Sequence, residues 1–345
     1  MKQTIIGVDL AKDVIQVCIY SNKKVHSNTE MTPKEFTLWL TNQTASIVVF
    51  EACGTSNYWK QKATSLGHDA RLISPNLVTA IRQNQKTDRN DALAIVQASQ
   101  LPEVKFIAGK SNKQQQLQSI MRMRELCVKQ RTAMKNQLIA LLAEFNIKPL
   151  TKNGGLNAVV SSVLEDGDNG LTFEFRIALD TAWNTYKSSI LAIERYDECL
   201  QAAVEAHPEC KKLMKLEGVG VLNAVNLYIA LGCSEIGVFK KGKDAAACIG
   251  LTPIQYSSGG KTQIGSIGKY VKNTMLRSLL ITGAMSVINQ VMRRDPKTKK
   301  EQWLQSLVER RGKRCAAVAL ANKTVRTAFA LLTQGTEYKA ELLST

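Results

Sequence analysis

IIGVDLAKD, at residues 5–13, is the stretch that decides the fold of the N-terminal region. Its apolar run predicts a buried strand that ends at Asp9, and the residues after it predict a short turn into a second strand over 14–20. A carboxylate at the end of a buried strand is costly unless it is paired, protonated or bound to a metal ion. Asp9 is therefore a candidate site residue.

Three more acids occupy comparable places in the sequence. Glu51 ends the apolar run IVVF at 47–50, and Asp88 and Asp91 lie in KTDRND at 86–91. The spacing of Asp88 and Asp91 puts both on one face of the helix predicted over 88–100. If the strands that end in Asp9 and Glu51 are neighbours, the four carboxylates converge on one point. Carboxylates suit a hard divalent cation, so we expect Mg²⁺, with Mn²⁺ as the alternative ion.

Four carboxylates of this kind fit phosphoryl transfer assisted by two metal ions that lie about 3.5–4 Å apart. Cations close to the acids would hold phosphates beside the metal: Lys12, Arg82, Lys86 and Arg89. A purely structural interpretation stays open, in which Asp88 is the N-cap of its helix, Asp91 is the acid of the first turn, and Glu51 pairs with a lysine.

Residues 1–108 alternate between patterns typical of strands and of helices. The order predicted is three strands, a helix, a strand, a helix, a strand and a helix. Such an order indicates a mixed α/β sheet domain that could carry the four acids at its strand ends.

The overall composition indicates what this site would act on. Lysine and arginine number 46 against 29 acidic residues, which gives a net charge of +17. Nucleic acid is the best-fitting partner because Lys and Arg neutralise phosphates; a basic protein that is merely kept soluble is the alternative. The length of 345 residues predicts two or three domains.

Localisation is predicted from further features of the sequence. No run is apolar enough for a secretory signal or a membrane span, so we expect a cytoplasmic protein with no membrane partner. The eight cysteines form no C-x-x-C pair, which predicts reduced, mostly buried thiols rather than a zinc site or a disulfide framework.

Residues 109–210 have a composition typical of long helices. Apolar residues recur at threes and fours and predict one helix from Ser111 to Phe145 and a second from Phe173 to Ala206. Polar stretches that contain glycine, at 149–155 and 166–170, predict breaks between them. Two long antiparallel helices would form a spacer or a coiled-coil dimerisation arm, and a bundle within one chain is the alternative.

Residues 211–345 predict a mainly helical region with two glycine-rich segments. LEGVG at 216–220 is similar to a helix-hairpin-helix turn, in which Gly218 and Gly220 would present N–H groups to a phosphate. Glu217 replaces the usual proline, and a plain tight turn is the alternative. GLTPIQYSSGGK at 250–261 predicts a flexible phosphate-binding loop. Basic residues in and after this loop would contact nucleic acid: Lys261, Lys269, Lys272, Arg277, Arg293 and Arg294.

Several of these motifs together resemble one family. IGVDLAKD, FEACGTS, KTDRNDA and GLTPIQYSSG resemble motifs of the DEDD-type insertion-sequence transposases, the bridge-RNA-guided recombinases of bacterial mobile elements. The order of elements in residues 1–108 is similar to the ribonuclease-H-like (RuvC-like) fold of Holliday-junction resolvases. The segment ALANK at 319–323 also resembles one branch of the family, so the resemblance spans nearly the whole chain.

The resemblance implies a domain plan and roles for individual residues. Residues 1–108 would be a RuvC-like catalytic domain, 109–210 a helical spacer, and 211–345 a C-terminal transposase domain with a serine loop. Ser258, rather than the adjacent Ser257, would be the nucleophile because Gly259 follows it. The metal-binding quartet would be Asp9, Glu51, Asp88 and Asp91.

The resemblance also implies partners. These are donor and target DNA, an element-encoded guide (bridge) RNA, and further copies of the chain in a dimer or tetramer. Two other interpretations stay open. One is a metal-dependent Holliday-junction-type endonuclease that uses water as the nucleophile, and the other is a protein that binds nucleic acid without catalysis.

Overall fold

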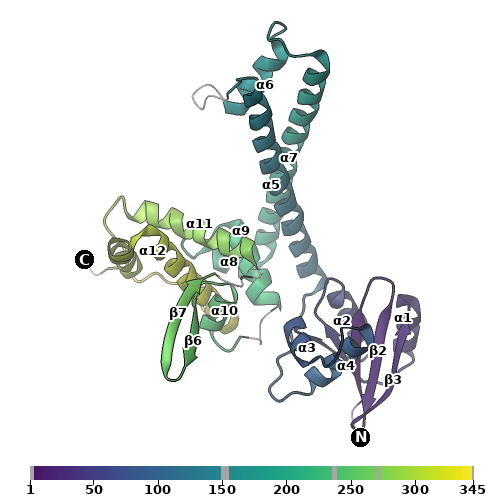
Figure 1. Ribbon diagram of the computed structural model, residues 1–345. Coiled ribbons are helices and arrows are strands. Elements are labelled where there is room, and N and C mark those ends of the chain that lie inside the picture. The colour runs from purple at the N-terminus through teal and green to yellow at the C-terminus, as the bar shows by residue number, and fades with distance from the viewer. Residues whose placement is uncertain (1–3, 149–154, 235–238, 269–270, 272, 344–345) are drawn as a thin grey trace. The chain divides into compact units, whose positions relative to one another are not determined.

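The computed structural model describes residues 4–148, 155–234, 239–268, 271 and 273–343. Two compact units are defined by their internal contacts: residues 116–208, and residues 1–115 together with 209–345. The N-terminal region is mixed α/β and the C-terminal region is mostly helical (Figure 1), so the broad fold class predicted from the sequence is confirmed.

The N-terminal region is built on one five-stranded mixed sheet with the strand order β3-β2-β1-β4-β5. β1 pairs antiparallel with β2 and parallel with β4, and its residue Val8 lies opposite Phe50 of β4. The elements, in chain order, are β1 (Ile5–Leu10), β2 (Ile15–Ser21), β3 (Lys24–Met31), α1 (Pro33–Thr41), β4 (Ile47–Glu51), α2 (Ser56–Ser65), β5 (Asp69–Ile73), α3 (Pro75–Ile81) and α4 (Asp88–Ser99). The predicted order of strands and helices is confirmed.

Both faces of this sheet are covered. Side chains of a strand alternate between faces, so Val8 packs with Phe36 of α1 and Trp59 of α2, while Ile73 packs with Ile95 of α4 on the opposite face. Two-sided burial explains why β1 and β4 read as continuous apolar runs rather than as alternating ones.

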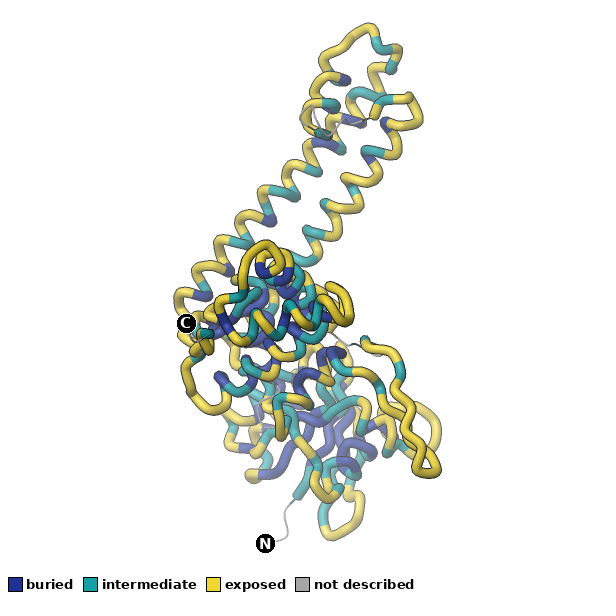
Figure 2. The backbone as a smooth tube through the Cα atoms, turned by 90° about the vertical axis from the view of Figure 1, so that its left-hand side faces the viewer, coloured by how far each residue is buried: buried dark blue, intermediate teal, exposed yellow. Residues whose placement is uncertain are grey.

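The unit of residues 116–208 consists of two long helices and a short one. These are α5 (Asn112–Glu144), α6 (Gly155–Glu165) and α7 (Phe173–Ala206). Buried residues recur along α5 and α7 between exposed ones (Figure 2), and Leu138, Val160 and Trp183 share one core at the end where α6 lies. Arg124 of α5 donates to Asp197 of α7 at 2.5 Å, which fixes an antiparallel pair within one chain.

The C-terminal region is helical except for one hairpin. Its elements are α8 (Pro208–Met214), α9 (Val221–Leu227), a π-helix (Tyr228–Ser234), α10 (Gly242–Cys248), β6 (Pro253–Ser258), β7 (Lys261–Ile267), α11 (Thr274–Val291) and α12 (Lys299–Gln334). α12 is two helical segments that meet at Gly312, where φ is +80°. Four basic residues flank this kink: Arg310, Arg311, Lys313 and Arg314.

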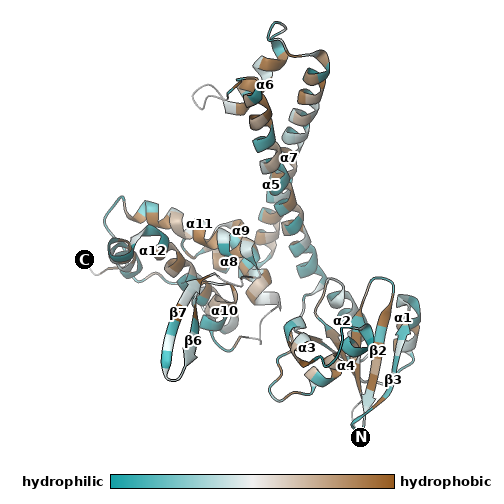
Figure 3. Ribbon diagram, in the orientation of Figure 1, coloured by the Kyte–Doolittle hydropathy of each residue, from teal (hydrophilic) through white to brown (hydrophobic). Residues whose placement is uncertain are grey.

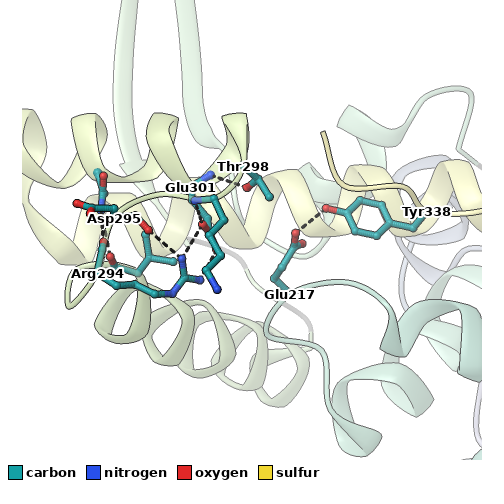
Figure 4. Close-up of polar contacts among 9 residues, drawn as sticks. Glu217, Arg294, Asp295, Thr298, Glu301 and Tyr338 are labelled. Atoms are coloured by element: carbon teal, nitrogen blue, oxygen red, sulfur yellow. Dashed lines mark hydrogen bonds and ion pairs between the residues drawn. The ribbon is translucent and has the colours of Figure 1, made fainter. Parts of the chain in front are cut away.

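The segment that follows α12 is tied back onto the start of that helix. Glu217 accepts a hydrogen bond from Lys300 at 2.6 Å. It also accepts one from the Tyr338 hydroxyl at 2.7 Å (Figure 4). The backbone N–H of Lys299 also donates to the Glu341 carbonyl at 3.0 Å. These contacts join the turn before α9, the first turn of α12 and the C-terminal segment.

Two further expectations concern burial and membrane spans. None of the cysteines whose side chains the structure describes forms a disulfide, but among them only Cys18 and Cys210 are buried, so the expectation of mostly buried thiols is wrong. Among the described residues, α12 is the single helix long and apolar enough to cross a membrane by length and composition, and half of its apolar window is buried within the protein.

Candidate active site

Gly7 brings the helix that carries two of the acids against the strand that carries the first. A Cβ atom on Gly7 would lie 2.5 Å from the backbone oxygen of Ala92 and 2.6 Å from a methyl carbon of Val96. Only a glycine therefore lets α4 lie directly on β1. The sequence pattern flagged Asp9 but not this role of Gly7, although both belong to the same IGVD motif.

The four acids occupy three neighbouring elements. Asp9 lies near the end of β1 and Glu51 ends β4, the parallel strand beside it. Asp88 and Asp91 lie in the first turn of α4. The carboxyl ends of parallel neighbours meet at one edge of the sheet, and α4 begins there because of the contact at Gly7.

Charge interactions confirm that the acids are close to one another. Burial raises the pKa of Asp9, and repulsion from Asp91 and then Asp88 raises it further. Burial likewise raises the pKa of Glu51, followed by repulsion from Asp9 and Asp91. Lys86 opposes both shifts. Carboxylates that repel one another in this way attract a cation, because a cation relieves the repulsion.

Asp91 is balanced by a neighbouring arginine. Arg82, which ends α3, donates from Nη1 to Asp91 Oδ1 at 2.8 Å, and the Asp91 side chain is only 9% exposed. Burying a carboxylate this deeply needs a partner. The expected use of Arg82 as a phosphate ligand therefore competes with an ion pair inside the site.

The alternative interpretation of Asp88 as the N-cap of its helix is wrong. Thr87 is the N-cap of α4, since its hydroxyl accepts from the backbone N–H of Asn90 at 3.3 Å. Asp88 follows the cap and is exposed, so capping does not explain an acid at this position. Favourable interaction with the helix dipole remains available to both Asp88 and Asp91 in the first turn.

The four acids offer the oxygen ligands that a divalent cation prefers, although their side chains are not arranged around one point in the structure. Throughout the part of the chain that the structure describes, no three His, Cys, Asp or Glu side chains are arranged to hold a metal ion. The fit is in the chemistry: four oxygen-donor side chains with mutual repulsion, gathered at one sheet edge.

The other cations expected near the acids are on the surface. Lys12, Lys86 and Arg89 are all exposed. Lys86 acts electrostatically on both Asp9 and Glu51. The backbone carbonyl of Arg89 accepts from Asn28 of β3 at 2.9 Å, which anchors the start of α4 to the edge of the sheet and leaves the guanidinium exposed.

Ser258 lies at the turn of a β-hairpin, where the sequence predicted a flexible loop. β6 and β7 pair antiparallel, with Ser258 opposite Lys261. Gly259 and Gly260 have φ of +55° and +77°, and two positive φ values in a two-residue turn require glycine-like residues. Figure 3 draws most of the hairpin in teal and white, so it is largely hydrophilic. The segment is therefore a regular hairpin rather than a flexible loop.

Ser257 and Ser258 point to opposite faces of the hairpin because strand side chains alternate. Both are exposed, and Ser257 lies opposite Thr262. Among the described residues, the Ser258 hydroxyl forms no hydrogen bond.

The glycines of the LEGVG turn have a packing role. Gly218 has a φ of +76°, and a Cβ atom there would lie 2.8 Å from the backbone oxygen of Gly283 in α11. Gly220 is the N-cap of α9 and has open space beside it. Close helix packing accounts for Gly218, whereas phosphate binding by Gly218 and Gly220 stays a prediction.

The remaining predicted contacts differ in their surroundings. Lys261 is exposed in the hairpin, and Arg277 of α11 donates from Nε to the Gly250 carbonyl at 3.1 Å. Arg294 donates to Glu301 at 2.6 Å, which neutralises its charge within the chain (Figure 4). Arg293 is exposed. Lys269 and Lys272 lie outside the described residues.

Comparison with known proteins identifies the family of the chain. Residues 6–147 match a model described as Transposase, the DEDD type of IS110 elements, and residues 210–300 match the Transposase IS116/IS110/IS902 family. The chain is 35% identical over 336 residues to the transposase for insertion sequence element IS1111A of Coxiella burnetii, covering 97% of this chain and 91% of that protein. It is 32% identical to a probable family 20 transposase of Pseudomonas aeruginosa, covering 97% and 98% of the two chains.

A more distant relative is a pilin gene-inverting protein of Moraxella bovis, 24% identical over 83% of this chain and 84% of that protein. The fold, the acids and these similarities define an enzyme that acts on DNA in transposition or recombination. The chain belongs to the IS110 family of insertion-sequence transposases.

Proposed function

We propose that the protein is an RNA-guided DNA recombinase that moves its own insertion sequence and joins DNA through a phosphoserine intermediate. The observation that carries this proposal is the exposed Ser258 beside the Gly259-Gly260 turn. A hydroxyl at the end of a narrow hairpin can approach a phosphodiester that a hydroxyl on a flat helix face could not reach.

The proposed step is a transesterification at a DNA phosphate. The Ser258 Oγ forms a bond to the phosphorus of a DNA phosphodiester and loses its proton to a base. The bond from phosphorus to one neighbouring sugar oxygen breaks, and that oxygen takes up a proton to leave as a hydroxyl. Attack by a freed DNA hydroxyl on the phosphoserine reverses the step and rejoins a strand.

The acidic cluster would assist this chemistry. Bound Mg²⁺, or Mn²⁺ in its place, would supply positive charge at the phosphate. It would be held by Asp9, Glu51, Asp88 and Asp91. The strand order, with β1 between an antiparallel and a parallel neighbour, supports assigning the domain to the ribonuclease-H-like, RuvC-like fold. Exposed Lys12, Lys86 and Arg89 would hold the DNA backbone next to the acids.

Guidance by RNA and assembly into a dimer or tetramer belong to the same proposal. The net charge of +17 supports binding of more than one nucleic-acid strand. Base pairing by a guide RNA would choose donor and target DNA, so the protein needs to read only backbone shape. Several strand ends must be cut and rejoined, which one serine per chain can do only in an oligomer.

A second candidate rests on the acidic cluster alone. Because the four acids gather without Ser258, a metal-dependent Holliday-junction-type endonuclease could use water as the nucleophile. In that case the serine hairpin would serve only to grip DNA.

One experiment separates the two functions. Protein, Mg²⁺, guide RNA and end-labelled DNA are incubated, and covalent DNA–protein adducts are resolved on a denaturing gel. The recombinase predicts an adduct that is absent in Ser258→Ala and present in Ser257→Ala. Cleavage without an adduct that survives Ser258→Ala would establish the endonuclease instead.

A further inference from the structure

A basic groove lies in the C-terminal region, and neither Ser258 nor any of the four acids lines it. Its volume is about 1370 Å³, larger than the usual pocket for a small ligand. The lining residues come from α10 and the residues before it, from α11, from β7 and from α12. They include seven cations and no carboxylate: Lys240, Lys241, Lys243, Arg277, Arg314, Lys323 and Arg326.

Packing of α10 against α12 assembles this charge. A Cβ atom on Gly242 would lie 3.1 Å from the backbone oxygen of Arg326, so the first turn of α10 lies directly on α12. The Asp244 carboxylate caps α10 by accepting from the Lys241 backbone N–H at 3.2 Å, and Asp244 does not line the groove. Lysines of α10 and cations of α12 are therefore held side by side.

Several of the groove cations remain available to bind a ligand. Lys241, Lys243, Lys323 and Arg326 are exposed. In the part of the chain that the structure describes, none of them forms an ion pair with a carboxylate, in contrast to Arg294 with Glu301. Holding like charges together without partners costs free energy, which an anionic ligand would recover.

An aromatic ring adds a second kind of contact. Trp303 lines the groove and is partly exposed, and the Lys323 ammonium lies 4.8 Å from the centre of its ring. A positive groove with an aromatic side chain is the combination that binds single-stranded nucleic acid, where phosphates follow the cations and bases stack. Duplex DNA presents its phosphates on a convex surface and stacks no base on a side chain.

The groove is connected to the serine hairpin. Leu251 and Ile267, on either side of the hairpin base, both line it. Arg277 donates to the Gly250 carbonyl at 3.1 Å, and Asn322 donates to the Leu251 carbonyl at 3.0 Å. α11 and α12 thus clamp the residues from which β6 starts, so a strand in the groove would lie at the foot of the hairpin that carries Ser258.

We propose that this groove binds a single-stranded segment of nucleic acid and leads it to the serine hairpin. The shared chemistry is a flexible phosphodiester strand with unpaired bases, and the test distinguishes RNA from DNA as its source. The link to Ser258 rests on the proposed function, whereas binding in the groove does not.

The test uses full-length Ser258→Ala protein without divalent metal, so that binding is measured apart from chemistry. The protein is titrated into labelled oligothymidylate and oligouridylate of about 12 nucleotides, a length within the range of single-strand binding sites. A labelled duplex of equal length is titrated separately for comparison. Anisotropy is followed at several salt concentrations. The groove variant is Lys241→Ala with Lys323→Ala and Arg326→Ala. The control variant removes equal charge from exposed sites elsewhere: Lys24→Ala, Lys34→Ala and Lys148→Ala.

We expect the groove variant to bind one or both single strands more weakly by about a factor of 10 or more. The slope of log affinity against log salt concentration should also be lower by about 2, because each lost phosphate contact contributes about 0.7. The stronger of the two single strands identifies the source. Equal weakening in the control variant, or equal weakening for the duplex, would overturn the proposal.

Trp303→Phe gives a reading that does not depend on removing charge. Stacking of a base on Trp303 predicts that oligothymidylate quenches the tryptophan fluorescence of the protein and that Trp303→Phe removes this quenching, while Trp183→Phe leaves it. Quenching that persists in Trp303→Phe would contradict base stacking in the groove. If the strand binds but no serine adduct forms on the gel, the groove stands and the recombinase proposal fails.

Discussion

Gly7 and Ala92 lie so close that a Cβ atom on Gly7 would be 2.5 Å from the backbone oxygen of Ala92. This contact sets α4 on β1, and with it Asp88 and Asp91 beside Asp9. Gly7→Ala should therefore force the helix away from the strand and destabilise the protein by about 1–3 kcal/mol, as overpacking does in a filled core.

Chemical denaturation measures this cost, and Gly54→Ala is the matched control because a Cβ atom at Gly54 meets nothing within 4 Å. We expect Gly54→Ala to stay within about 0.5 kcal/mol of the parent. Equal effects of the two substitutions would show that the contact at Gly7 does not hold α4 in place.

The ion pair between Arg82 and Asp91 leads to a second prediction. Arg82→Gln leaves the Asp91 carboxylate buried without a cation and should cost about 2 kcal/mol or more. The comparison is Lys129→Gln, which breaks an exposed pair with Glu125 and should cost about 0.5 kcal/mol or less. Thermal unfolding of both variants at neutral pH tests the difference, which vanishes if Arg82 does not neutralise Asp91.

Removal of one crowded acid should change how the protein responds to metal. The pKa of Asp9 is raised above its ordinary value of 3.8 by burial and by its acidic neighbours, so its ionised form destabilises the fold. Without divalent ions, Asp9→Asn should raise the melting temperature at neutral pH. This gain should shrink as the pH falls through the raised pKa of Asp9 and be lost below 3.8, where Asp9 is neutral in both the folded and the unfolded parent.

Adding Mg²⁺ should reverse the order of the melting temperatures of the parent and Asp9→Asn. Binding to the four acids stabilises the parent, whereas Asp9→Asn lacks a ligand and gains less. Calorimetry with and without Mg²⁺ gives both numbers. A gain from Mg²⁺ that is the same in parent and variant would rule out Asp9 as a ligand.

Glu217 gives a prediction for the acid range. Burial works to raise its pKa, but hydrogen bonds from Lys300 and Tyr338 outweigh burial and lower it below the ordinary value of 4.5. Its stabilising contribution is therefore complete above 4.5 and disappears as the pH falls through the lowered value. Glu217→Gln should cost about 1.5–3 kcal/mol at neutral pH and progressively less in acid.

Urea denaturation of Glu217→Gln across this range measures the trend. Glu341→Gln serves as the control, since its pair with Lys299 is exposed and 3.7 Å long. A difference between Glu217→Gln and the parent that stays constant with pH would mean that the charge of Glu217 plays no part.

Much of the N-terminal site could be predicted from the sequence because local patterns determine it. The apolar runs before Asp9 and Glu51 give their strands, and the helical spacing gives the common face of Asp88 and Asp91. The Arg82–Asp91 pair could not be predicted, because it depends on where the end of α3 lies against α4 in three dimensions. The role of Gly7 is hidden for the same reason.

The regions outside the N-terminal domain show where local patterns are insufficient. The short helix α6 was missed because glycine-containing polar stretches on both sides indicated a continuous break, although Leu156, Val160 and Val163 form one apolar face. The basic residues of the groove are visible as KKGK at 240–243, but their meeting with Lys323 and Arg326 depends on the packing at Gly242.

The central claim is that the acidic cluster and Ser258 serve one reaction, with Ser258 as the nucleophile. Mass spectrometry of the protein after reaction with DNA, guide RNA and Mg²⁺, followed by nuclease and protease digestion, tests it most directly. The account predicts a nucleotide remnant on Ser258, absent when Asp9→Asn protein is used. A remnant on Ser257 or another residue, or an undiminished remnant on Ser258 in Asp9→Asn protein, would contradict it.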